Sequence, residues 1–347
     1  MTSTAGFSGR SGGRAVRPTR RRLLTAVVWV AVAVSAWFAV ELLLGHVDWR
    51  AVRASLGLVS VPSAVVLVVL LLVRQVLSAA PLAYYVPGLS LVRSVQSDLT
   101  ASLLATFAPT PSDIVVRVAM FRSWGLDPVM GLAGSAINSV KFYTIRFGAP
   151  LLGLVLLVPR GADVGTVWPA LASALVAAVL LTALLLLARA DHLAAWLGRT
   201  AARAVRRFHR AADPERWASV LVETRANAER GLRRGLVPSM VALTGMVLAE
   251  GVLLVVALRA VGVGAAELPS VEIVGLFLLL FVVTALPLYG LGVLDALLVA
   301  AWVSATSPQL EPELIAGTVV WRVVTLAGIY VLGLGSLAQW RWEERGR

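Results

Sequence analysis

The segment "TALPLYGLGVLDALL", residues 284–298, decides how the rest of the sequence is interpreted. It lies among long apolar runs, yet it contains a proline, two glycines one residue apart, a tyrosine and an aspartate. Proline and glycine interrupt helices, and an ionisable group is costly inside a membrane. The segment therefore predicts a broken helix that carries a polar group at membrane depth.

The composition indicates a membrane protein. Of the 347 residues, 59% are hydrophobic and only 14% are charged, whereas about a quarter of the residues in a soluble domain are charged. Several apolar runs reach the roughly 20 residues that a helix needs to cross a bilayer. We therefore expect an all-α polytopic membrane protein.

The charges and the missing residue types narrow the function. The net charge is +12, but the arginines cluster beside apolar runs, so anionic lipid headgroups explain them better than nucleic acid does. The sequence has no cysteine, and its histidines, His46, His192 and His209, lack metal-ligand spacing. No GxSxG, HExxH or Walker A motif occurs. We expect a protein that is not an enzyme and that holds no metal and no cofactor.

We predict six full spans and two re-entrant helical hairpins. The spans cover approximately residues 23–44, 62–84, 129–158, 167–190, 236–261 and 314–337. The hairpins cover residues 97–128, broken at Pro109 and Pro111, and residues 271–305, broken at Pro287, Gly290 and Gly292. Each apolar piece of a hairpin is too short to cross alone, and a broken helix at membrane depth is tolerated where it lines a polar cavity.

The distribution of arginines predicts the orientation. The N-terminus, residues 84–128, residues 190–235 and the C-terminus are basic and should face the cytoplasm, whereas the other loops are poor in positive charge. The sides assigned to these loops agree with the number of membrane crossings only if the two hairpins enter from opposite faces. Such an arrangement is typical of inverted-repeat transporters. We expect a multi-pass protein of the plasma membrane with both termini in the cytoplasm.

The predicted domain organisation has three parts. Residues 1–19 form a disordered basic N-terminus, residues 20–340 form the transmembrane domain, and residues 341–347 form a basic tail. The first apolar run resembles a signal peptide, but it continues to Leu44, so we interpret it as a retained span. Residues 191–235 predict a pair of amphipathic helices on the inner leaflet, with a regulatory or partner-binding element as the alternative.

Charged residues within the spans are the candidate functional residues, because each costs about 2.5–3.5 kcal/mol to insert. They are Arg74, Lys141, Arg146, Glu250, Asp295 and Arg322, with Asp113 and Arg117 beside the first break. Lys141 and Arg146 lie about 140° apart on a helix, so they share no groove unless that helix kinks. Structural pairs remain the alternative: Asp295 or Glu250 with Arg322, and Asp113 with Arg117 one turn later.

The two broken segments resemble the flippase-like transmembrane domain of the lysylphosphatidylglycerol synthase family. The late motif of that family, Pro-x-Pro-Gly-Gly-x-Gly-Val-x-Glu, is matched by Pro287, Gly290, Gly292, Val293 and Asp295, whereas Leu288 and Tyr289 depart from it. The early motif is similar to Pro109 or Pro111, Asp113 and Arg117, with Ser112 in place of a glycine. Arg322 and Gly333 resemble the arginine and glycine of the family's last helix; Asn138 and Lys141 stand where a further motif is expected.

The resemblance implies lipid translocation. We expect Arg117, Lys141 and Arg322 to bind an anionic headgroup, and Asp113 and Asp295 to orient them or to carry a coupling proton. The substrate would be an anionic phospholipid or a polyprenyl-phosphate-linked lipid. The sequence ends soon after its last predicted span, so we expect no soluble aminoacyl-transfer domain and no synthesis of lysyl-lipid.

Two other functions stay open at this point. One is a membrane-embedded transferase that acts on lipid-linked substrates. The other is a non-catalytic membrane subunit that docks a lipid or cell-envelope synthase through residues 191–235. The expected partners are therefore membrane lipids, and either a partner synthase or a second copy of the chain.

Overall fold

The computed structural model describes residues 49–107, 112–161, 164–189 and 214–346. Within these ranges every regular element is a helix, which confirms the predicted all-α class. All of them belong to one compact unit, residues 46–347. The predicted first span, the basic N-terminus, Pro109, Pro111 and the first helix of the amphipathic pair lie outside the described residues.

Five helices of the described part are long and apolar enough to cross a membrane. They are α3 (Val61–Tyr85), α6 (Pro128–Leu157), α7 (Val164–Arg189), α9 (Pro214–Ala260) and α12 (Glu311–Arg345). Each overlaps one of the predicted spans almost completely. Helix α3 shows why they suit lipid: Val65, Val69 and Val73 are about half exposed along its length, and such a surface is unfavourable in water.

Helix α9 differs from the prediction. We expected an amphipathic helix to end near residue 235 and a separate span to begin at Leu236. The structure has one continuous helix of 47 residues, Pro214–Ala260. Gly235 and Pro238 lie inside it, and Gly235 keeps a negative φ, so the left-handed turn that ends many helices does not form there.

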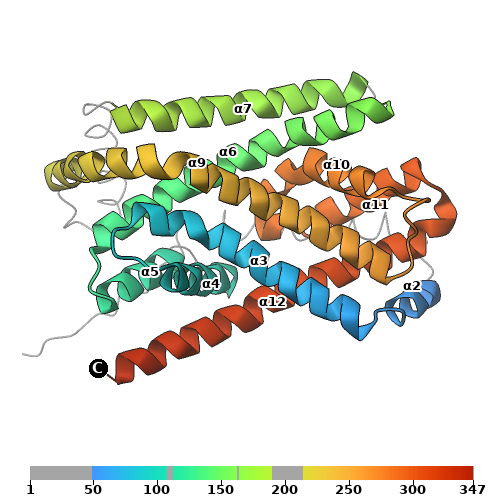
Figure 1. The fold of residues 1–347 in the computed structure, drawn as a ribbon, viewed down its shortest axis with the longest axis horizontal. Coiled ribbons are helices and arrows are strands. Elements are labelled where there is room, and N and C mark those ends of the chain that lie inside the picture. The colour runs from blue at the N-terminus through green and yellow to red at the C-terminus, as the bar shows by residue number, and fades with distance from the viewer. Residues whose placement is uncertain (1–48, 108–111, 162–163, 190–213, 347) are drawn as a thin grey trace, which may run out of the picture. The chain divides into compact units, whose positions relative to one another are not determined.

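The short helices form two pairs. Helix α4 (Leu91–Phe107) packs on α5 (Ser112–Ser123), and α10 (Ser270–Leu280) packs on α11 (Val293–Ala305). A further helix, α2 (Trp49–Leu56), contacts α12. In Figure 1 the pair α4/α5 and the pair α10/α11 lie toward opposite ends of the long helices.

The quoted segment is broken as predicted. Helix α10 passes into two 3-10 turns, η2 (Phe281–Ala285) and η3 (Pro287–Gly290), before α11 begins. Gly290 and Gly292 have φ values of 68° and 83°, a left-handed conformation that glycine adopts readily. Pro287 begins the second turn, where its fixed φ is compatible with the backbone.

Small residues let the helices approach closely. A Cβ on Gly153 of α6 would lie 2.6 Å from the carbonyl oxygen of Gly275 in α10, and a Cβ on Gly333 of α12 would lie 2.9 Å from that of Leu99 in α4. Close packing of this kind holds helices together in membranes, where the surrounding lipid is as apolar as the side chains. Through the contact between Gly333 and Leu99, the C-terminal half of α12 packs against α4. Its N-terminal half carries Arg322, which meets Asp295 of α11.

Candidate functional site

A cavity lies where the broken segment meets the long helices. Its lining comes from α3, α6, α9, α10, the two 3-10 turns and α12, and it has an empty volume of about 500 Å³, part of which is open to the outside. The lining contains Arg74, Arg146, Arg322 and Glu250, together with five aromatic side chains. The broken segment contributes Thr284 and Tyr289, so it borders a cavity whose mostly apolar lining holds four charged side chains.

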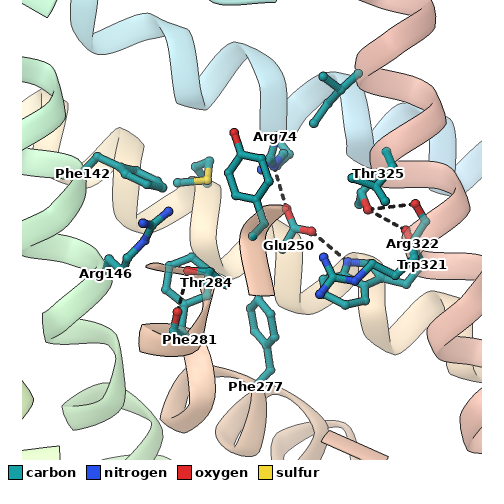
Figure 2. Close-up of a pocket in the computed structure, with 14 residues that line it drawn as sticks. Arg74, Phe142, Arg146, Glu250, Phe277, Phe281, Thr284, Trp321, Arg322 and Thr325 are labelled. Carbon is teal, nitrogen blue, oxygen red and sulfur yellow. Dashed lines mark hydrogen bonds and ion pairs between the residues drawn. The ribbon is translucent and has the colours of Figure 1, made fainter. Parts of the chain in front are cut away.

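Glu250 ties three helices together at the centre of this cavity (Figure 2). Its Oε2 accepts a hydrogen bond from Arg74 Nε at 2.6 Å, and its Oε1 accepts one from Trp321 Nε1 at 2.8 Å. Arg74 also donates to the side chain of Gln75. Glu250 is only 6% exposed, and both of its carboxylate oxygens have a hydrogen-bond partner, which offsets the cost of burying them.

Asp295 plays two structural roles at the start of α11. One carboxylate oxygen accepts from Arg322 Nε at 2.6 Å, and the other accepts from the backbone N–H of Gly292 at 2.8 Å. The negative charge therefore lies at the helix N-terminus, where the helix dipole favours it. Of the two pairings considered from sequence for Arg322, the structure contains the one with Asp295, whereas Glu250 pairs with Arg74.

Two guanidinium nitrogens of the cavity have no hydrogen-bond partner among the described residues. They are Nε of Arg146 and Nη2 of Arg322, and both are buried. Arg146 is 5% exposed and stacks on Phe142 and Tyr143, with its Cζ 4.5 and 5.1 Å from the ring centroids. In the described ranges no carboxylate lies within ion-pair distance of Arg146. An unsatisfied buried donor costs about 1–3 kcal/mol, more when it is charged.

Figure 2 shows how the arginines surround the cavity. Arg146 extends from α6 on one side, Arg322 belongs to α12 on the other side, and the Arg74–Glu250 pair lies between them. Since Glu250 neutralises Arg74 and Asp295 neutralises Arg322, the positive charge of Arg146 remains uncompensated. Planar guanidinium groups in such surroundings match the oxygens of phosphate or carboxylate.

Arg117 is paired, but with a residue that the sequence did not suggest. Its Nη2 donates to Asp98 Oδ1 at 3.0 Å and its Nη1 donates to Ser97 Oγ at 3.3 Å. The structure has no ion pair between Arg117 and Asp113, so the local pairing considered from their spacing is wrong. Asp113 lies half-buried in the first turn of α5. Asp98 also accepts a hydrogen bond from Ser78 Oγ of α3 at 3.3 Å, so this pair joins α4 and α5 to α3.

Lys141 lies outside the cavity lining. It is fully buried, donates to Ser239 Oγ at 2.9 Å, and sits 3.6 Å from the centroid of the Tyr85 ring. The hydroxyl of Tyr85 is hydrogen-bonded to the same Ser239 oxygen. Arg146, on the same continuous helix, does line the cavity. Lys141 and Arg146 therefore face different surroundings, as the angle between them predicts. Lys141 does not line this cavity with Arg322, although the sequence predicted that both bind the headgroup.

Tyr289 occupies a strained backbone position. Its φ is +57°, and it is the sole non-glycine residue with positive φ among those described. A side chain with a Cβ pays about 1–2 kcal/mol to adopt this conformation. Glycine, which has no Cβ, is the residue that adopts this conformation most readily. Strain of this kind gathers at functional sites.

The arrangement places buried guanidinium groups beside a cavity, and their chemistry suits an anion. The described residues contain no cluster of three or more histidine, aspartate or glutamate side chains that could hold a metal. Sequence reasoning found Arg322 and Asp295, and it counted Arg74, Arg146 and Glu250 as unusual without assigning them to the site. It missed Asp98 and the aromatic lining. Neither a protein-family model nor a curated protein matches the sequence, so the geometry of the cavity has to indicate the function.

Proposed function

We propose that this chain is an integral membrane lipid transporter of flippase-like type. It binds the headgroup of an anionic phospholipid or of a polyprenyl-phosphate-linked lipid in the cavity lined by Arg74, Arg146 and Arg322. One observation carries the proposal: Arg146, buried among apolar membrane helices, has an unsatisfied Nε and no carboxylate partner in the described part of the chain. An anionic ligand would satisfy both the charge and the donor.

The paired residues of the cavity have a positioning role in this proposal. Asp295 orients Arg322 through Nε and leaves its Nη2 free to reach a headgroup oxygen. Glu250 likewise fixes Arg74, and Trp321 fixes Glu250. Because these side chains are already held in place, the headgroup meets a preorganised site and less ordering is needed on binding.

Three observations support a transport topology. The helix pairs α4/α5 and α10/α11 lie toward opposite ends of the long helices, as hairpins that enter from opposite faces of the plasma membrane would (Figure 1). The broken segment borders the cavity, and binding sites of inverted-repeat transporters lie at such breaks. The distribution of arginine-rich segments favours a cytoplasmic position for both termini. We extend the proposal to a relationship with the flippase-like domain of the lysylphosphatidylglycerol synthase family, through Pro287, Gly290, Gly292 and Asp295.

Reconstitution tests the proposal. Purified protein is placed in liposomes that carry a labelled anionic phospholipid in the inner leaflet, and the label that becomes accessible from outside is followed over time. We expect wild-type protein to accelerate the movement and Arg146→Gln to slow it on the order of tenfold or more, because a hydrogen bond to a charged group is lost.

The matched control is Arg160→Gln. Arg160 also forms part of the described helical unit, but it is 42% exposed and pairs with Glu272 at 3.5 Å, away from the cavity lining. This variant should move lipid at the wild-type rate. A chemically altered lipid would identify a transferase, and movement that appears only with an added synthase would identify a subunit. Either result would overturn the transporter proposal.

A further inference from the structure

The charge balance of the cavity indicates which anion it accepts. Three guanidinium groups, those of Arg74, Arg146 and Arg322, face two carboxylates, those of Glu250 and Asp295. One positive charge is left over. Resting on the proposed function, we infer that the cavity selects a headgroup with a single negative charge, a phosphodiester, over a phosphomonoester or a diphosphate.

The neighbouring charges leave this balance unchanged. Asp98 and Arg117 neutralise each other at 3.0 Å. Lys141 does not line the cavity and is enclosed by Tyr85 and Ser239. In the described part of the chain, Arg74, Arg146, Arg322 and Glu250 are the charged residues that line this space, and Asp295 contributes to the balance through its ion pair with Arg322.

The free donors match the same headgroup. Nε of Arg146 and Nη2 of Arg322 are the two cavity nitrogens that are buried without a hydrogen-bond partner among the described residues. A phosphodiester has two non-bridging oxygens, which equals the number of these donors. A phosphomonoester has three such oxygens and carries about −1.5 to −2 charges at pH 7, so it brings more charge and more acceptors than the cavity compensates.

The surroundings make the mismatch costly. Ion pairs in a poorly polarisable interior interact far more strongly than in water. The second negative charge of a phosphomonoester would leave water without a cation in the cavity to neutralise it, and burying this unpaired charge lowers affinity on the order of tenfold or more. We therefore expect the phosphodiester to bind on the order of tenfold more tightly than the monoester with the same chains.

Lipid-dependent thermal stabilisation of the purified protein in detergent micelles tests this inference. The probes are phosphatidylglycerol, phosphatidic acid and phosphatidylcholine with identical acyl chains, and a polyprenyl phosphate sugar as a second anionic phosphodiester. Phosphatidylcholine, a phosphodiester whose choline cancels its negative charge, is the neutral control. Wild-type protein should be stabilised at the lowest concentration by the two anionic phosphodiesters. The order between those two separates a glycerophospholipid from a polyprenyl source, and either order supports the inference.

Charge variants give the decisive comparison. Asp295→Asn and Glu250→Gln each remove one negative charge, which raises the net charge at the cavity by one. Each should therefore shift the preference toward phosphatidic acid about tenfold. The control Arg160→Gln should leave the preference unchanged. Equal binding of phosphatidylglycerol and phosphatidic acid by the wild type, or an unaltered preference in both charge variants, would overturn the inference while the transporter proposal stands. Failure of every anionic lipid to bind would overturn both.

Discussion

Asp295 joins Arg322 to the start of α11: one carboxylate oxygen lies 2.6 Å from Arg322 Nε and the other lies 2.8 Å from the backbone nitrogen of Gly292. Replacing Asp295 by alanine removes both bonds, whereas asparagine keeps an acceptor for the Gly292 N–H. We expect Asp295→Ala to lower the free energy of unfolding by about 3–5 kcal/mol, because it leaves a buried arginine unpaired. Asp295→Asn should cost about 1 kcal/mol less. Denaturant unfolding in detergent measures both, and equal losses would show that the helix-start bond contributes nothing.

The conformation of Tyr289 gives a second prediction. Tyr289→Gly and Tyr289→Ala both remove the aromatic ring, but alanine keeps the Cβ that is unfavourable at a φ of +57°. We expect the glycine variant to be more stable than the alanine variant by about 1 kcal/mol, the strain relieved less the extra entropy of an unfolded glycine. The difference in melting temperature between the two checks this. An alanine variant as stable as the glycine variant would mean that the strained conformation relaxes at no cost.

The features that could be predicted from the sequence are those that depend on residues adjacent in the chain. Pro287, Gly290 and Gly292 act on their own backbone, so the break between α10 and α11 was visible in the letters. The partners of charged residues depend on packing between distant segments. Arg74 pairs with Glu250, 176 positions away, and Arg117 pairs with Asp98 of the preceding helix instead of Asp113 one turn away. No local pattern chooses between such partners. The boundary expected before Leu236 failed because proline and glycine weaken a helix without always ending it.

The Arg74–Glu250 pair can be tested by a double-mutant cycle. Arg74→Met leaves the Glu250 charge buried without its cation, so we expect a loss of about 3–5 kcal/mol in the free energy of unfolding. Adding Glu250→Gln removes that charge and keeps an acceptor for Trp321 Nε1, which donates to it at 2.8 Å. The double variant should therefore be more stable than Arg74→Met alone by at least about 1 kcal/mol. Additive losses would show that the two residues are not coupled.

Lys141 gives the last prediction, because its surroundings suggest a packing role. Its amine is fully buried and meets a hydroxyl and an aromatic ring, but no carboxylate in the described part of the chain. Methionine fills a similar volume without a charge, and Ser239 keeps its bonds to Tyr85 and to the Leu236 carbonyl. We expect Lys141→Met to stay within about 1.5 kcal/mol of the wild-type stability, and Lys141→Ala to lose about 2–5 kcal/mol through the cavity that it leaves. Thermal unfolding of the two variants side by side separates volume from charge. If methionine destabilised the protein as much as alanine, the ammonium itself, through the Tyr85 ring and the Ser239 hydroxyl, would be what holds α3, α6 and α9 together at this point.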